Sequence, residues 1–307
     1  MTATPAWITF VQCGKGNQRG PGLTEPLLAW VEAELGGRMA VSAVRSLHGG
    51  ESPWRIDLTA SDGSAFSAVL RFPSSRIGPD QIATNAAALA VAEKHRLPAP
   101  RLLAADLDGR AAGTPASLES VVPGTSTWPA APSAELLLAA GAAIAQVHTV
   151  ILDPQPRLPF RPRPIAVDDF AQDRRDGRMP TTALLHLADE RVQSIKAPEA
   201  PVVFVHGDVW PGNTVLAGGA YVLIDWKTAG VGHPGVDLGE LRKQVAICYD
   251  DDAPGHVLEG WERASGARAG DIPYWDAVAA LNTPTESYSP YATLRRDDFL
   301  QAAIAQL

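Results

Sequence analysis

The sequence predicts an α+β protein with two lobes, a β-rich lobe over residues 1–122 and a mainly helical lobe over residues 123–307. Two observations predict this class. Short alternating strand patterns with hairpin signals dominate the first part, and alanine- and leucine-rich helical patterns dominate the second. The length of 307 residues suffices for two domains, and 46% hydrophobic with 20% charged residues excludes a disordered or fibrous chain.

The first lobe is predicted to begin with a helix and to continue mainly with strands. Its elements are, in order, a helix over 24–35, strands over 41–47, 54–58 and 66–72, a helix over 79–96 and a strand over 117–122. Asp62-Gly63 predicts a hairpin between two of the strands, because the tight turn needs positive φ angles. Pro98 and Pro100 end the second helix, since proline removes a backbone donor.

The second lobe alternates helices with a few short strands. Helices are predicted over 134–150, 167–172, 181–195, 238–250, 256–264 and 274–281, and strands over 202–205, 214–216 and 221–223. The prolines between 154 and 164 predict an extended surface loop.

The charge of the chain is uneven. All of the net charge of −8 lies in residues 123–307, which carry 23 acidic and 15 basic side chains. This excess would favour a cationic ligand, and a solvated acidic surface explains it equally well. An acidic chain is a poor candidate for nonspecific binding to nucleic acid, so no nucleic-acid partner is expected.

The apolar runs and the cysteines indicate in which compartment the protein is expected and whether it holds disulfides or zinc. The longest apolar run, 136–145, is far shorter than the ~20 residues that a bilayer requires, and the N-terminus lacks a secretory signal pattern. We therefore expect a cytoplasmic protein without a membrane partner. Cys13 and Cys248 are far apart in sequence and indicate neither a disulfide framework nor a zinc site.

One segment of the second lobe concentrates polar residues at strand ends. The predicted strand over 202–205 runs directly into the sequence HGDVWPGN, and the hairpin that follows delivers Asp225 at the end of its second strand. Asp208, Asn213 and Asp225 are therefore expected on connected loops at one site. Capping of turns by the two aspartates is the alternative, but buried acids without partners would be costly.

These residue types match the chemistry of phosphoryl transfer. One carboxylate can orient and deprotonate an attacking hydroxyl, while an amide oxygen and a second carboxylate hold Mg²⁺ against nucleotide phosphates. The oxygen donors of asparagine and aspartate are the hard ligands that Mg²⁺ prefers. An ordinary aspartate is a weak base, so positioning must contribute more than basicity.

The combination HGDxxxxN, followed after eleven residues by Asp225, resembles the signature of the aminoglycoside phosphotransferase family, in the choline-kinase-like branch of the protein-kinase fold. Further segments resemble the family at 49–50, 69–71, 97–101, 122–124 and 145–148. The resemblance implies a two-lobed protein-kinase-like fold with the nucleotide between the lobes. It further implies that Asp208 is the catalytic base, that Asn213 and Asp225 bind Mg²⁺, and that His206 is a structural partner of the loop.

The candidate nucleotide site departs from the family pattern. The third strand normally presents a lysine that pairs with a helix glutamate, but no lysine occurs between Lys15 and Lys94. Arg71 is predicted to contact the phosphates instead, since a guanidinium can grip phosphate oxygens; an exposed arginine at a strand end is the alternative. Asn85 stands where the glutamate is expected, so either the acidic partner lies elsewhere or nucleotide binding is weak.

Other positions leave alternatives open. Gly49-Gly50 is predicted to cover the nucleotide phosphates, with an ordinary turn pair as the alternative. Asp237 is either a helix N-cap or, as the resemblance implies, a brace behind the catalytic loop. The acidic run 250–252 is interpreted as a solvated helix end rather than a substrate contact, and Trp261 and Trp275 as core residues.

The sequence therefore predicts a Mg²⁺-dependent phosphotransferase that moves the γ-phosphate of ATP or GTP to a hydroxyl of a small, cationic molecule. Aminoglycoside-type antibiotics, amino alcohols and sugar derivatives are the candidate acceptors, the first implying a role in antibiotic resistance. The alternative is a catalytically weak or inactive kinase-like protein that binds nucleotide or serves as a scaffold. Intact Asp208, Asn213 and Asp225 favour the enzyme, whereas Asn85 favours the alternative.

Overall fold

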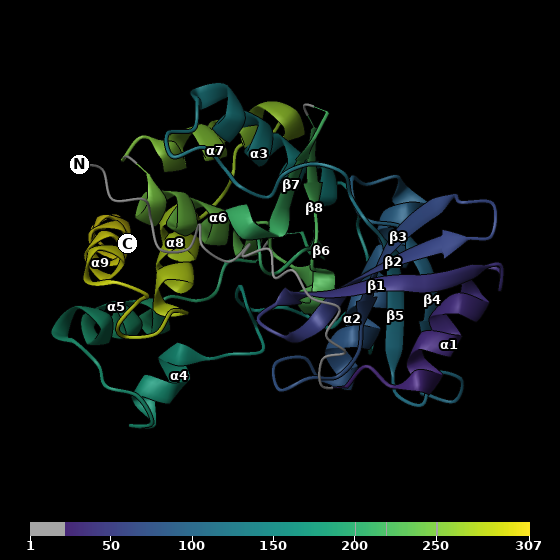
Figure 1. Ribbon diagram of the computed structural model, residues 1–307. Helices are drawn as coiled ribbons and strands as arrows, with labels where there is room; N and C mark the ends of the chain where they lie inside the picture. Colours follow the sequence, from purple (N-terminus) through teal and green to yellow (C-terminus); the bar gives the residue numbers. More distant parts are fainter. Residues whose placement is uncertain (1–21, 200, 219, 250) are drawn as a thin grey trace. The chain divides into compact units, whose positions relative to one another are not determined.

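The computed structural model describes residues 22–199, 201–218, 220–249 and 251–307, so the prediction about Cys13 lies outside the described residues. The chain forms two compact units that divide between Pro123 and Gly124 (Figure 1). No helix in the described part of the chain has both the length and the apolar character needed to cross a bilayer.

The first unit is built around one five-stranded sheet. Its elements are α1 (Glu25–Glu34), β1 (Met39–His48), β2 (Glu51–Ala60), β3 (Ala65–Arg71), α2 (Pro79–His95), β4 (Leu102–Asp106) and β5 (Ala116–Ser120). The strands lie in the order β1-β2-β3-β5-β4, and every neighbouring pair is antiparallel. Asp62-Gly63 forms the predicted turn between β2 and β3, where Gly63 has a φ of 83°.

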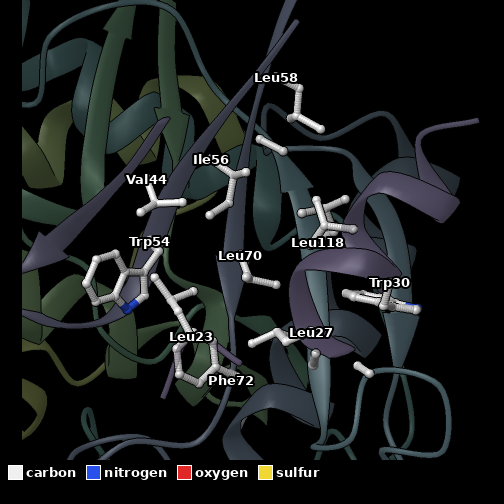
Figure 2. Packing of buried hydrophobic residues seen from close by; sticks show 14 residues of the cluster. Leu23, Leu27, Trp30, Val44, Trp54, Ile56, Leu58, Leu70, Phe72 and Leu118 are labelled. Carbon is white, nitrogen blue, oxygen red and sulfur yellow. The ribbon is translucent and has the colours of Figure 1, made fainter. Parts of the chain in front are cut away.

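The core of the first unit lies between this sheet and α1 (Figure 2). Alternate residues of β2 are buried, as expected for a strand with one covered face, and Ile56 and Leu58 belong to this set. Leu70 of β3 and Leu118 of β5 are buried in the same cluster, together with Leu27 of α1. Burial of each such side chain contributes roughly 1.5–3 kcal/mol. This packing fixes the end of β3, where Arg71 follows Leu70.

The second unit is mainly helical and carries two short strand pairings. Its helices are α3 (Ala134–Val147), α4 (Phe170–Arg175), α5 (Ala183–Ser194), α6 (Gly235–Cys248), α7 (Ala253–Ser265), α8 (Ile272–Leu281) and α9 (Pro290–Ile304). Its strands are β6 (Val203–Val205), β7 (Thr214–Ala217), β8 (Ala220–Leu223) and β9 (Gly230–Gly232). β6 pairs with β9 and β7 pairs with β8, both antiparallel.

Glycines allow two helix pairs of this unit to pack backbone against backbone. A Cβ atom at Gly141 of α3 would lie 2.0 Å from the Val257 oxygen of α7, and one at Gly260 of α7 would lie 2.0 Å from the Leu138 oxygen of α3. A Cβ atom at Gly239 of α6 would likewise lie 2.4 Å from the Trp275 oxygen of α8. Any larger residue at these positions would force the helices apart.

The structure corrects several element predictions. The proline-rich segment is more than a surface loop, because Phe160 forms a parallel bridge with Val231 and extends the edge of β9. Strands β4 and β9 and helix α9 were not predicted. Helix α6 begins at Gly235 instead of Leu238, which places Asp237 inside its first turn. The α+β class is confirmed.

Candidate active site

The candidate catalytic loop begins where β6 ends. Gly207 follows His206 with a φ of 81°, a left-handed conformation that glycine adopts without strain. A Cβ atom at Gly207 would also lie 2.5 Å from the Thr228 oxygen, so the turn requires glycine for space as well as for conformation. This turn leads from the buried strand to Asp208.

Asp237 holds this turn from the interior. Its carboxylate accepts hydrogen bonds from the backbone N–H of His206 at 2.8 Å and of Gly207 at 2.7 Å. His148 Nε2 donates to the same carboxylate at 3.1 Å, while Trp261 Nε1 donates to His148 Nδ1 at 2.9 Å. The N-cap prediction for Asp237 is therefore wrong, and the alternative of a brace behind the loop is confirmed.

The Asp237 carboxylate is ionised in spite of complete burial. Burial alone would raise its pKa, but the hydrogen bond from His148 and the other donors outweigh burial and lower the pKa below the ordinary value. A buried carboxylate with three donors is costly to disturb, because removal of any partner leaves a charge or a donor unpaired.

His206 ties the loop to the end of β8. Its Nε2 donates to the Ile224 oxygen at 2.9 Å, and its Nδ1 accepts from the backbone N–H of Asp208 at 3.3 Å. The ring packs against Trp226, with centroids 4.5 Å apart, and is fully buried. Burial lowers the pKa of His206, so the ring is neutral and each nitrogen has one fixed role. This geometry agrees with the structural role predicted for His206.

The structure brings Asp208, Asn213 and Asp225 together, as the sequence predicted. Asn213 ends a short 3₁₀ turn and donates from Nδ2 to the backbone oxygen and to Oδ2 of Asp208, both at 3.0 Å. The backbone oxygen of Asn213 accepts from Ile224 N at 2.9 Å, which fixes the position of Asp225 next along the chain. Asp225 has a φ of 66°, a left-handed conformation that is uncommon outside glycine.

Lys227 is a member of the site that the sequence interpretation missed. Its ammonium forms an ion pair with the Asp225 carboxylate and lies 3.7 Å from Oδ2 of Asp208. The available signal was its position, two residues after a candidate metal ligand. Because lysines are common near acidic residues, spacing alone would not have distinguished it.

The protonation of Asp208 is suited to proton transfer near neutral pH. Burial raises its pKa to about 7, Lys227 opposes this rise, and the negative charge of Asp225 adds to it. A carboxylate with such a pKa is a better proton acceptor than an ordinary aspartate.

The donor set of this site fits Mg²⁺. The described residues include no cluster of three or more histidine, cysteine, aspartate or glutamate side chains that could hold a metal ion by themselves. Mg²⁺ does not need such a cluster, because it is commonly bound by one or two carboxylates together with waters and substrate phosphates. The Asp225 carboxylate and Oδ1 of Asn213, whose Nδ2 is already bonded to Asp208, supply hard oxygen ligands of this kind.

In the first unit, Arg71 belongs to a buried network. Its Nε and Nη2 donate to Oε1 of Glu119 at 3.1 and 2.9 Å, and Nδ2 of Asn85 donates to Oε2 of Glu119 at 3.0 Å. Arg71 is 3% exposed, so the alternative of an exposed arginine at a strand end is wrong. The acidic partner of Arg71 lies on strand β5 instead of helix α2, and Asn85 donates to the same carboxylate.

Gly49 and Gly50 form the two-residue turn between β1 and β2. Their φ angles of 60° and 95° are left-handed, as a tight hairpin turn requires. Ser46 Oγ accepts hydrogen bonds from the backbone N–H of His48 and Gly50, which stabilises the turn. Hairpin geometry therefore accounts for both glycines.

The two tryptophans and the described residues of the acidic run singled out in the sequence lie where they were expected. Trp261 and Trp275 are 7% and 4% exposed, which confirms that they are core residues. The Asp251 side chain is 88% exposed and pairs with Arg295, which agrees with a solvated helix end. Asp250 lies outside the described residues.

Comparison with known proteins establishes the family. The model of the phosphotransferase enzyme family matches residues 43–281, and the chain belongs to this family. The predicted resemblance is thereby confirmed. No curated protein matches the sequence.

Solved structures share the fold at low sequence identity. A macrolide 2′-phosphotransferase from Brachybacterium faecium is 18% identical with a TM-score of 0.59, over 86% of this chain and 100% of that one. A choline/ethanolamine kinase family protein from Mesorhizobium loti is 18% identical with a TM-score of 0.58, over 90% and 97%. An amicoumacin kinase in complex with AMP-PNP and Ca²⁺ is 13% identical with a TM-score of 0.58, over 92% and 94%. The predicted protein-kinase-like fold is confirmed.

Proposed function

We propose that this protein is a Mg²⁺-dependent phosphotransferase that transfers the γ-phosphate of ATP or GTP to a hydroxyl group of a small, cationic molecule. The observation that carries the proposal is the close placement of Asp208, Asn213 and Asp225. Asn213 donates to Asp208 on a loop held by Asp237, and Lys227 lies against both Asp208 and Asp225. Aminoglycoside-type antibiotics, amino alcohols and sugar derivatives remain the candidate acceptors. Family membership supports the reaction class, and the acidic second unit supports a cationic acceptor.

In this proposal Asp208 acts on the acceptor. Its carboxylate orients the hydroxyl and takes its proton as the new oxygen–phosphorus bond forms and the bond to the leaving nucleoside diphosphate breaks. The raised pKa of Asp208 suits this role. Asn213 and Asp225 would hold Mg²⁺, which offsets phosphate charge when bound.

The first unit is proposed to bind the nucleotide. Arg71 would contact phosphate oxygens while Glu119 fixes the plane of its guanidinium, and the turn at Gly49-Gly50 would lie over the phosphates. A catalytically weak scaffold protein was the alternative, because Asn85 replaces the expected glutamate. The bond between Arg71 and Glu119 supports the active enzyme, since the arginine has an acidic partner after all.

The test is Mg²⁺-dependent consumption of ATP and of GTP against a panel of aminoglycosides, other amine-bearing antibiotics, amino alcohols and sugars. Asp208→Asn should lower kcat at least ~100-fold with the productive acceptor, in the range typical of a lost general base. Asp108→Asn makes the same change at an aspartate whose side chain is 58% exposed and should leave kcat unchanged. Equal turnover by the native protein and the Asp208 variant would refute the proposal.

A further inference from the structure

Lys227 is held in place by its neighbours on both sides. Trp226 and Thr228 are buried, and the Trp226 ring stacks on Phe204 with centroids 5.4 Å apart. Trp226 Nε1 donates to the Leu223 oxygen at 2.9 Å, and Thr228 Oγ1 donates to the His206 oxygen at 3.3 Å. The backbone of Lys227 is therefore fixed on both sides by the catalytic loop and by β8. Its side chain is 20% exposed, far less than that of a typical surface lysine.

The ammonium of Lys227 lies between two carboxylates that need a counter-charge. The Asp208 and Asp225 side chains are 13% and 21% exposed, so water solvates their charges poorly. An ammonium in contact with Asp225 and 3.7 Å from Asp208 offsets part of this charge. Asp225 is also the only carboxylate among the proposed Mg²⁺ ligands. Lys227 and a bound divalent cation would therefore compete for the Asp225 oxygens.

We propose that Lys227 is a resident counter-ion of the metal site, which makes the binding of the divalent cation depend on the nucleotide. This inference rests on the proposed function of the Asp225 site. A divalent cation alone would compete with the ammonium for Asp225 and brings no acceptor oxygen of its own, which weakens its binding. Nucleotide phosphates that arrive with the metal would give the ammonium new acceptor oxygens, which strengthens their joint binding.

The first part of the test measures Mg²⁺ binding alone by titration calorimetry. Lys227→Met removes the competing charge and should tighten Mg²⁺ binding about tenfold, within the usual range of coupling between two ligands. Lys227→Arg keeps the charge and should bind Mg²⁺ within about threefold of the native protein. Lys196→Met makes the same change at a lysine whose side chain is 81% exposed and should have no effect.

The second part measures binding of AMP-PNP at saturating Mg²⁺. Here Lys227→Met should bind about tenfold more weakly, because the phosphates lose a cationic partner. The two effects have opposite signs, which a general loss of structure would not produce. The inference would be overturned if Lys227→Met bound both ligands more weakly, or if its affinity for either one of them were unchanged. If Lys227→Met does not fold, Lys227→Gln provides the same uncharged comparison.

Asp225→Asn separates this inference from the proposed function. If the native protein binds Mg²⁺ and Asp225→Asn does not, the metal site stands, and the Lys227 variants then decide the inference alone. If Mg²⁺ binding in the presence of AMP-PNP is absent in the native protein or is unaffected by Asp225→Asn, the proposed metal site and the inference both fail.

Discussion

The two charged networks of this protein are built in different ways. In the second unit, Asp208, Asn213 and Asp225 lie within 18 residues on loops that follow short strands, and their hydrogen bonds join near neighbours in the chain. In the first unit, the bond from Arg71 to Glu119 spans 48 residues and joins two strands of the sheet. The site residues of the second unit are therefore brought together by local turns, and Asp237 braces their loop from a distant segment. The pair of Arg71 and Glu119 depends entirely on the order of strands in the sheet.

This difference predicts how each network fails. The loop network depends on one buried carboxylate, Asp237, which receives donors from the loop and from His148, directly after α3. The sheet network is held by strand register and by the apolar core around Leu70. A single substitution should therefore disturb the loop more than the sheet.

The largest effect is expected for Asp237→Ala. Loss of this carboxylate leaves the N–H groups of His206 and Gly207 and the His148 ring without their acceptor. We expect a destabilisation of about 3–5 kcal/mol, as for other broken buried networks, measured by urea unfolding. Asp251→Ala, at an exposed aspartate, is the control. A loss below ~1 kcal/mol would show that the brace is unimportant for stability.

Acidification should destabilise the second unit through His233. Burial lowers the pKa of His233 to about 4 from an ordinary 6.5, so the unfolded chain takes up this proton first as the pH falls. The contribution of neutral His233 to the free energy of unfolding is complete above pH ~6.5. As the pH falls from ~6.5 to 4, this contribution is lost, which lowers the free energy of unfolding by up to about 3 kcal/mol.

The control for this pH dependence is His233→Asn. Nδ1 of His233 accepts from Gly235 N at 2.8 Å, and an asparagine oxygen can take over this role without titrating. Urea unfolding between pH 4 and 7 should therefore show a flatter pH dependence for the variant. Identical slopes in the two proteins would rule out His233 as the titrating group.

The pair of Arg71 and Glu119 in the sheet should tolerate a conservative substitution better than the loop around Asp237 does. Glu119→Gln keeps the shape of the side chain but removes the charge that pairs with Arg71, and we expect a loss of about 2 kcal/mol in the free energy of unfolding. If Arg71 contacts phosphate, the KM for nucleotide should rise while kcat changes less. A fall in kcat at constant KM would contradict the phosphate contact.

The smallest effect is expected in the hairpin turn. Gly49→Ala imposes a side chain on a left-handed residue and should cost about 1 kcal/mol. Beyond its two chain neighbours, no residue in the described part of the chain has an atom within 4 Å of the added Cβ. If the turn also covers the phosphates, the variant should raise the nucleotide KM further than its small loss of stability explains. An unchanged KM would leave the glycines with a conformational role alone.

The same difference explains what the sequence could predict. Turn glycines, strand ends and residue spacing are local, so Asp208, Asn213 and Asp225 could be placed together before the structure was known. The Asp237 brace was anticipated only as one of two alternatives, because its helix begins three residues earlier than the pattern indicated.

Contacts between segments that are distant in the chain could not be predicted from local sequence patterns. Glu119 meets Arg71 because β5 lies beside β3 in the sheet, although β4 precedes β5 in the chain. The sequence pattern indicates each strand but not this order. Lys227 was missed for another reason: a lysine two residues after an aspartate does not by itself indicate that their side chains meet.

The central claim is that Asp208, Asn213 and Asp225 form a phosphoryl-transfer site. The most direct measurement follows phosphorus NMR of ATP, Mg²⁺ and the productive acceptor with the native protein and with Asp208→Asn. The account predicts a new phosphomonoester signal with the native protein, which disappears when Mg²⁺ is chelated and is nearly absent for the variant. Formation of the same product at the native rate by Asp208→Asn would contradict the account.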